Sequence, residues 1–139
     1  MSGEAPFDRV VARLRESVTG LRVVYRFGSH ATEAERADSD LDLAVLTDPP
    51  LDPDARMHLR WTVAERVAAL VRRDVDLVDL GSASTVFRAH VVTSGERLWC
   101  ADVAEAERFE MYALSAYARL NEERAGILRD IHARGRIRG

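Results

Sequence analysis

Apolar side chains recur at helical spacing in four segments, which therefore predict four helices. The predicted helices cover residues 5–19, 53–72, 85–93 and 102–133. The apolar stripe of the second helix is expected to pack in the core rather than to stack on a base. That stripe consists of Met57, Trp61, Ala64, Val67, Ala68 and Val71.

Four shorter runs, rich in Val, Leu and aromatic residues, predict β-strands. They cover residues 21–27, 40–46, 75–80 and 97–101. The three prolines within residues 47–53 require a loop before the second helix, and Ser84 is a candidate cap for the third. At 139 residues the chain is expected to form one domain, residues 1–139, in the α/β (α+β) class.

The last predicted helix is long, with a possible interruption at Gly126 and a basic tail at residues 135–139. Its apolar stripe could cover the sheet or meet a partner protein, and the pattern leaves both readings open. The stripe consists of Phe109, Tyr112, Ala113, Ala116, Tyr117 and Leu120.

Two carboxylates stand together at the start of the second strand. Asp40 and Asp42 are two residues apart, so their side chains share one face of that strand. Neighbouring carboxylates repel each other unless a cation lies between them, and Mg²⁺ commonly takes one or two carboxylates plus substrate phosphates. The first strand ends at Gly28-Ser29, where a small residue and a hydroxyl could receive a phosphate.

The third strand, with the sequence VDLVDL, carries two further acids. An acid in an otherwise apolar strand is costly unless it is paired or bound to a metal. Asp76 and Asp79 point to opposite faces of this strand. Asp79 could instead cap the turn at Gly81-Ser82.

Composition narrows the class of protein. Apolar and charged fractions of 47% and 31% are those of a soluble globular chain, and the net charge of −3 argues against direct binding of nucleic acid. No apolar run is long enough to span a membrane, and no export signal is evident. The single cysteine, Cys100, cannot form an internal disulfide, so a cytoplasmic location is expected.

The combined pattern of Gly28-Ser29, ten intervening residues and Asp40-x-Asp42 resembles the signature of the DNA polymerase β-like nucleotidyltransferases. The short chain is most similar to the minimal nucleotidyltransferase (MNT) group, the antitoxins of HEPN/MNT toxin–antitoxin pairs. The resemblance implies a small mixed sheet backed by helices, the polymerase β-like palm, with a long C-terminal helix. Asp76 best matches the family's third acid, which lies on a strand beside the Asp-x-Asp strand, and Asp79 is the alternative.

By this resemblance Asp40, Asp42 and Asp76 would be the catalytic, metal-binding residues, with two Mg²⁺ ions, and Gly28 and Ser29 would hold the phosphates of ATP. The implied reaction moves AMP from ATP to a tyrosine of a HEPN ribonuclease toxin, which is thereby silenced. Two alternatives stay open: an antitoxin that neutralises its toxin by binding alone, and a nucleotidyltransferase acting on a small molecule such as an aminoglycoside.

Overall fold

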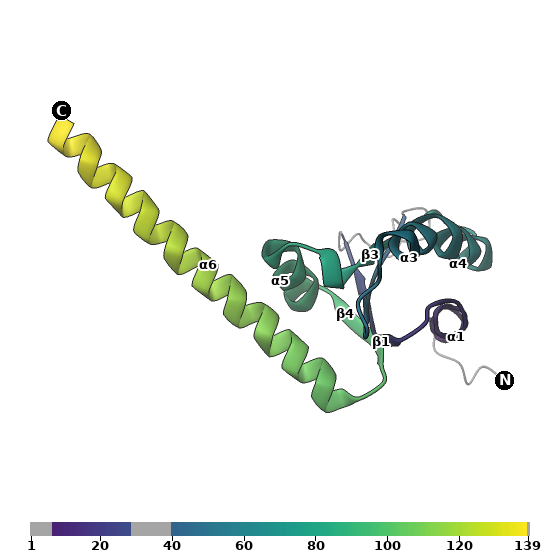
Figure 1. Ribbon diagram of the computed structural model, residues 1–139. Coiled ribbons are helices and arrows are strands. Elements are labelled where there is room, and N and C mark those ends of the chain that lie inside the picture. The colour runs from purple at the N-terminus through teal and green to yellow at the C-terminus, as the bar shows by residue number, and fades with distance from the viewer. Residues whose placement is uncertain (1–6, 29–39, 139) are drawn as a thin grey trace.

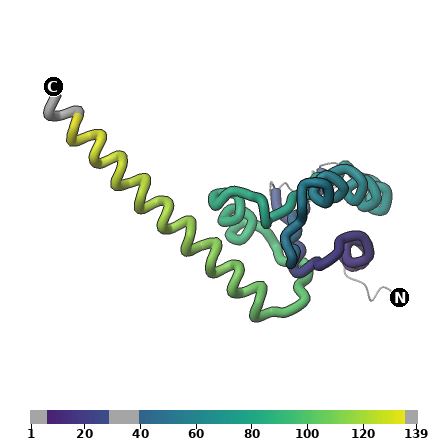
Figure 2. Tube along the Cα trace, in the orientation of Figure 1, coloured from purple at the N-terminus to yellow at the C-terminus, as the bar shows by residue number. Residues whose placement is uncertain are grey.

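A computed structural model describes residues 7–28 and 40–138 of the chain. One four-stranded sheet carries helices on its two faces, and a long C-terminal helix extends away from this body (Figure 1). The Cα trace in Figure 2 shows the same separation between the body and the far half of that helix. The elements are α1 (Asp8–Ser17), β1 (Leu21–Phe27), β2 (Leu41–Thr47), α3 (Pro53–His58), η1 (Leu59–Val63), α4 (Ala64–Val71), β3 (Val75–Asp79), η2 (Leu80–Ser82), α5 (Thr85–Ser94), β4 (Glu96–Cys100) and α6 (Val103–Arg138).

The strand order in the sheet is β3-β2-β1-β4, and the sheet is mixed. β1 runs antiparallel to both β2 and β4, whereas β2 and β3 are parallel. A parallel pair needs a crossover connection, which the helical segment from Pro53 to Val71 supplies. The starts of β2 and β3 and the end of β1 therefore lie at the same edge of the sheet.

Alternation along the strands divides the core between the two faces of the sheet. On one face Val24, Leu43, Val45 and Leu77 pack with residues of α1, η1 and α4. On the other face a second cluster packs with α5 and the start of α6, and its buried members are Val23, Tyr25, Ala44, Leu80, Val91 and Ala106. The predicted mixed sheet backed by helices is confirmed.

The second predicted helix contains a π-helical turn, η1, between α3 and α4. The prediction that Met57 and Trp61 pack in the core is wrong, because their side chains are 64% and 66% exposed. Leu59 and Val63 are buried instead. A π turn carries extra residues per turn, so it changes which side chains face the sheet relative to a regular α-helix.

Polar contacts fix the first half of α6 to the sheet. Arg22 of β1 donates to both carboxylate oxygens of Glu105, at 2.7 and 3.0 Å. The buried Tyr25 hydroxyl donates to Glu110 Oε2 at 2.7 Å, and Arg97 of β4 donates to the same oxygen at 3.0 Å. The orientation of α6 is thus set by both neighbouring strands.

The second half of α6 leaves the body without a break at Gly126, and the helix continues to Arg138, past the end expected from the sequence. Ile127, Leu128 and Ile131 are each more than half exposed on this part. Within the described residues, no helix is long and apolar enough to cross a membrane.

Candidate active site

Asp42 of β2 and Asp76 of β3 are direct partners in the parallel register. On the other side of β2, Phe27 at the end of β1 is the antiparallel partner of Asp42, and Gly28 follows at once. Three adjacent strands thus bring Gly28, Asp42 and Asp76 side by side at one edge of the sheet. The sequence separates these residues by 14 and 34 positions, and only the pairing of the strands joins them.

Gly28 lies against the Asp42 carboxylate. Its φ of +109° is a backbone conformation that side-chain-bearing residues rarely adopt, and a Cβ at this position would collide with Asp42 Oδ2. Gly28, which was predicted to receive a phosphate, is therefore also the residue that this backbone conformation and the neighbouring Asp42 side chain require. Ser29, predicted to share that role, lies outside the described residues.

Asp40 stands exposed immediately before β2. Its backbone carbonyl accepts a 3.4 Å hydrogen bond from Arg73, and the next residue, Leu41, donates its N–H to the Asp74 carbonyl at 2.8 Å. These contacts join the start of β2 to the turn before β3, which brings Asp40 to the same edge of the sheet.

The carboxylates influence each other electrostatically. Partial burial raises the pKa of Asp42 above its ordinary value, the charges of Asp76 and Asp40 raise it further, and Arg73 opposes the rise. A carboxylate with these neighbours gains from a nearby cation because the cation relieves the repulsion. In the described part of the chain no three His, Cys, Asp or Glu side chains lie close enough together to hold a metal ion by themselves. The set nevertheless fits Mg²⁺, which takes few carboxylates and completes its shell with water and phosphate oxygens.

Asp79 has a structural role. Its carboxylate accepts the Gly81 N–H at 3.0 Å and so caps η2, and its side chain is buried on the face of β3 opposite to Asp76. The capping role considered from the sequence is confirmed. Asp79 therefore already has a local hydrogen-bonding partner, whereas Asp76 is exposed beside Asp42.

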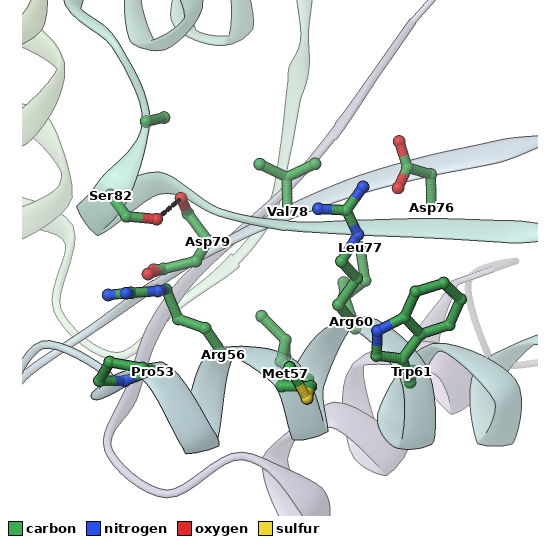
Figure 3. A pocket seen from close by; sticks show the side chains of 12 residues that line it. Pro53, Arg56, Met57, Arg60, Trp61, Asp76, Leu77, Val78, Asp79 and Ser82 are labelled. Atoms are coloured by element: carbon green, nitrogen blue, oxygen red, sulfur yellow. Dashed lines mark hydrogen bonds between the residues drawn. The ribbon is translucent and has the colours of Figure 1, made fainter.

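A cavity of about 470 Å³ lies along the free edge of β3, between that strand and α3–η1. The helical side of the lining includes Arg56, Met57, Arg60 and Trp61, and the strand side consists of Asp76, Leu77, Val78 and Asp79 (Figure 3). This cavity was not predicted from the sequence. The sequence does contain a pattern that could have indicated it. Two arginines, Arg56 and Arg60, are four residues apart, and so are Met57 and Trp61. Residues four apart lie on the same side of a helix, so these four side chains form two adjacent rows.

Replacement of Asp42 by Asn is expected to raise the free energy of unfolding of the metal-free protein at neutral pH. Because the folded protein raises the pKa of Asp42, the ionised carboxylate costs stability above that raised pKa, and the cost disappears as the pH falls below the ordinary value. Urea unfolding in EDTA at several pH values measures the effect. Asp74→Asn, an exposed neighbour, is the control, and an Asp42→Asn variant that is less stable than the wild type at pH 7 contradicts the argument.

Comparison with known proteins agrees with this geometry. Residues 11–104 match the family model described as polymerase beta, nucleotidyltransferase. The chain is 38% identical over 126 residues to the protein adenylyltransferase MntA of Shewanella oneidensis, covering 91% of this chain and 87% of that protein.

Two solved structures are similar over almost the whole chain. The first is a complex of tri-AMPylated Shewanella oneidensis HEPN toxin with MNT antitoxin, matched at 37% identity and a TM-score of 0.70 over 89% of this chain and 93% of that one. The second is a toxin–antitoxin complex with AMP-PNP, matched at 37% identity and a TM-score of 0.75 over 91% and 98%. The family match over residues 11–104 and the 38% identity to a protein adenylyltransferase show that the chain belongs to the polymerase β nucleotidyltransferase family.

Proposed function

We propose that this protein is an antitoxin that transfers AMP from ATP to a tyrosine of a HEPN toxin, with Asp40, Asp42 and Asp76 as its catalytic and metal-binding residues. The observation that carries the proposal is the register pairing of Asp42 with Asp76, with Gly28 packed directly against Asp42. This arrangement offers oxygen ligands for cations beside a backbone position that leaves room for a phosphate.

The chemistry follows from where these groups stand. Gly28, with no side chain, allows the triphosphate to approach the backbone at the end of β1. Asp40 and Asp42 would hold Mg²⁺, and Asp76 would complete the ligand set and accept the phenolic proton of the incoming tyrosine. Bound Mg²⁺ would supply charge neutralisation of the leaving pyrophosphate and a lower pKa for the attacking hydroxyl. ATP is the substrate on this proposal, as the AMP-PNP complex of a relative supports.

The relatives also support the choice of partner, since one of them is an MNT antitoxin in complex with an AMPylated HEPN toxin. The far half of α6 offers a surface for such a partner. Ile127, Leu128 and Ile131 stand exposed there at helical spacing, beyond the contacts that join α6 to the sheet. The AMP group would then block the toxin by adding bulk and negative charge where RNA phosphates bind. The cytoplasmic location stays a prediction.

The test is the intact mass of the HEPN toxin after incubation with this protein and Mg²⁺-ATP. We expect the mass of the toxin to rise by one or more AMP units, and the rise to disappear when EDTA is present. An inhibited toxin of unchanged mass in a stable complex would contradict the transferase proposal and support neutralisation by binding alone. An unmodified and uninhibited toxin would leave a small-molecule acceptor as the alternative.

A further inference from the structure

Asp42 and Asp76 point to the face of the sheet that α5 and the start of α6 cover. Side chains two residues apart on a strand share a face, and Ala44, two residues after Asp42, is buried in the cluster that packs with α5 and α6. Asp76 is the register partner of Asp42 and points to the same face. A ligand held by these carboxylates therefore has α5 as its neighbour, whereas α1, η1 and α4 cover the other face.

Phe27, the last residue of β1, connects the carboxylates to α5. It is the antiparallel register partner of Asp42, so the two side chains lie next to each other on this face. The ring of Phe27 meets the ring of Phe87 from α5 edge to face, with centroids 5.2 Å apart and an interplanar angle of 88°. Gly28, the proposed phosphate position, follows Phe27 in the chain. The aromatic pair thus begins beside both the phosphate position and the carboxylates.

His90 adds a third ring, one helical turn after Phe87 on α5. The two ring centroids are 6.4 Å apart, with an interplanar angle of 46°. Ser94 Oγ lies 3.4 Å from His90 Nδ1. Phe27 and Phe87 are half-buried, whereas His90 is exposed. We call Phe27, Phe87 and His90 the aromatic row, which leads from Asp42 to an exposed ring on the same face of the sheet.

The fold holds the aromatic row in place. The C-terminal end of α5 lies against the end of β1, because a Cβ at Gly95 would be 2.8 Å from the Arg26 carbonyl oxygen and 3.4 Å from the Phe27 Cβ. Two residues of α5, Ala89 and Val91, are buried beneath the helix. Rings that are already fixed lose little conformational freedom when a ligand binds, and this lowers the cost of binding.

The position of the aromatic row relative to Gly28 and Asp42 indicates which part of a ligand it would meet. When the phosphates of ATP lie at Gly28 and the carboxylates, the adenosine must continue beyond them. Nucleobases stack on aromatic side chains, since every base has a π-face. A relative has been solved with AMP-PNP, an analogue that carries the same base. The aromatic row therefore suits the base of the nucleotide.

We propose that the aromatic row binds the adenine ring of ATP, with the exposed ring of His90 packed against the base. The proposal rests on the function proposed above, in which ATP is the substrate. Phe27 and Phe87 support the position of His90 and fill the space between the base and Asp42. Binding of the base in this way holds the adenosine while the phosphates lie at Gly28. His90 is then a residue that determines the affinity for the nucleotide.

The test is calorimetric titration of the protein with AMP-PNP and with inorganic tripolyphosphate, both in Mg²⁺. We expect His90→Ala to weaken the binding of AMP-PNP about tenfold and that of tripolyphosphate less than about twofold, because only AMP-PNP carries a base. His90→Phe is expected to restore most of the loss, since an aromatic ring is kept. Phe87→Leu, which keeps an apolar side chain, is expected to weaken AMP-PNP in the same selective way.

His58→Ala is the matched control, since His58 is an exposed histidine of α3 outside the aromatic row. Wild-type affinity of His90→Ala for AMP-PNP would overturn the inference and leave the transferase function intact. An equal loss of tripolyphosphate affinity would also overturn it, because the row would then affect the phosphates instead of the base. A raised KM for the toxin with unchanged AMP-PNP affinity would assign the row to the acceptor. A wild-type protein that binds no AMP-PNP would overturn the proposed function, and this inference with it.

Discussion

Asp42→Asn is expected to reduce the rate of AMP transfer on the order of 10³-fold while leaving binding of the toxin unchanged. The substitution keeps the shape of the side chain and removes the charge that the cation and the developing transition state require. Loss of several kcal/mol of charge stabilisation corresponds to this factor, at tenfold for each 1.36 kcal/mol. Asp76→Asn is expected to have an effect of similar size, because Asp76 is the register partner of Asp42.

Initial rates of toxin modification, measured by intact mass at fixed Mg²⁺-ATP, provide the measurement. Asp74→Asn is the control, because Asp74 is an exposed carboxylate two residues before Asp76 and shares the same turn. Co-purification of each variant with the toxin separates loss of chemistry from loss of assembly. Transfer by Asp42→Asn at more than a tenth of the wild-type rate would contradict the assignment of this carboxylate.

Gly28→Ala is expected to abolish detectable binding of ATP and to lower the stability of the fold. The added Cβ would collide with the Asp42 carboxylate, and the φ of +109° would be strained for any residue with a side chain. Strain of this kind costs about 1–3 kcal/mol, and displacement of Asp42 would disturb its pairing with Asp76. Urea unfolding and titration with AMP-PNP measure the two effects separately.

Gly126→Ala provides the matched control for that experiment. Gly126 lies inside α6, where an added Cβ would meet nothing closer than the Arg129 side chain at 4.0 Å. Alanine is favoured over glycine in a helix interior by about 0.5–1 kcal/mol, so this variant should be slightly more stable and fully able to bind ATP. If Gly28→Ala bound AMP-PNP with wild-type affinity, the proposal that Gly28 makes room for the phosphates of the nucleotide would be wrong.

Much of the fold follows from local sequence. The strand over residues 21–27 has the predicted bounds, and the Ser84 hydroxyl caps α5 by accepting the Phe87 N–H at 3.1 Å. The cap formed by Asp79 on η2 was also foreseeable as an alternative. These features depend on alternation of side chains and on hydrogen bonds within a few residues, which a sequence displays directly.

The candidate active-site residues could not all be identified from local sequence, because they lie on strands that are far apart in the chain. The motif around Gly28 and Asp42 indicated the family, but the choice of Asp76 over Asp79 rested on resemblance alone. The parallel register adds a physical argument for Asp76, because it sets Asp76 beside Asp42 and turns Asp79 to the opposite face, and the catalytic role of Asp76 stays a prediction. The role proposed for Ser29 stays a prediction.

By itself the sequence determined the elements, the mixed α/β class, the family and the carboxylate pair at residues 40 and 42. Only the tertiary structure decided which distant acid stands beside that pair, and that Met57 and Trp61 face a cavity instead of the core. Helical periodicity assumes 3.6 residues per turn, so it assigns the wrong face wherever a π turn shifts the phase. The pairing of β3 with β2 depends on the helical crossover that joins them. The local sequence of residues 75–80 does not indicate which strand will pair with β3.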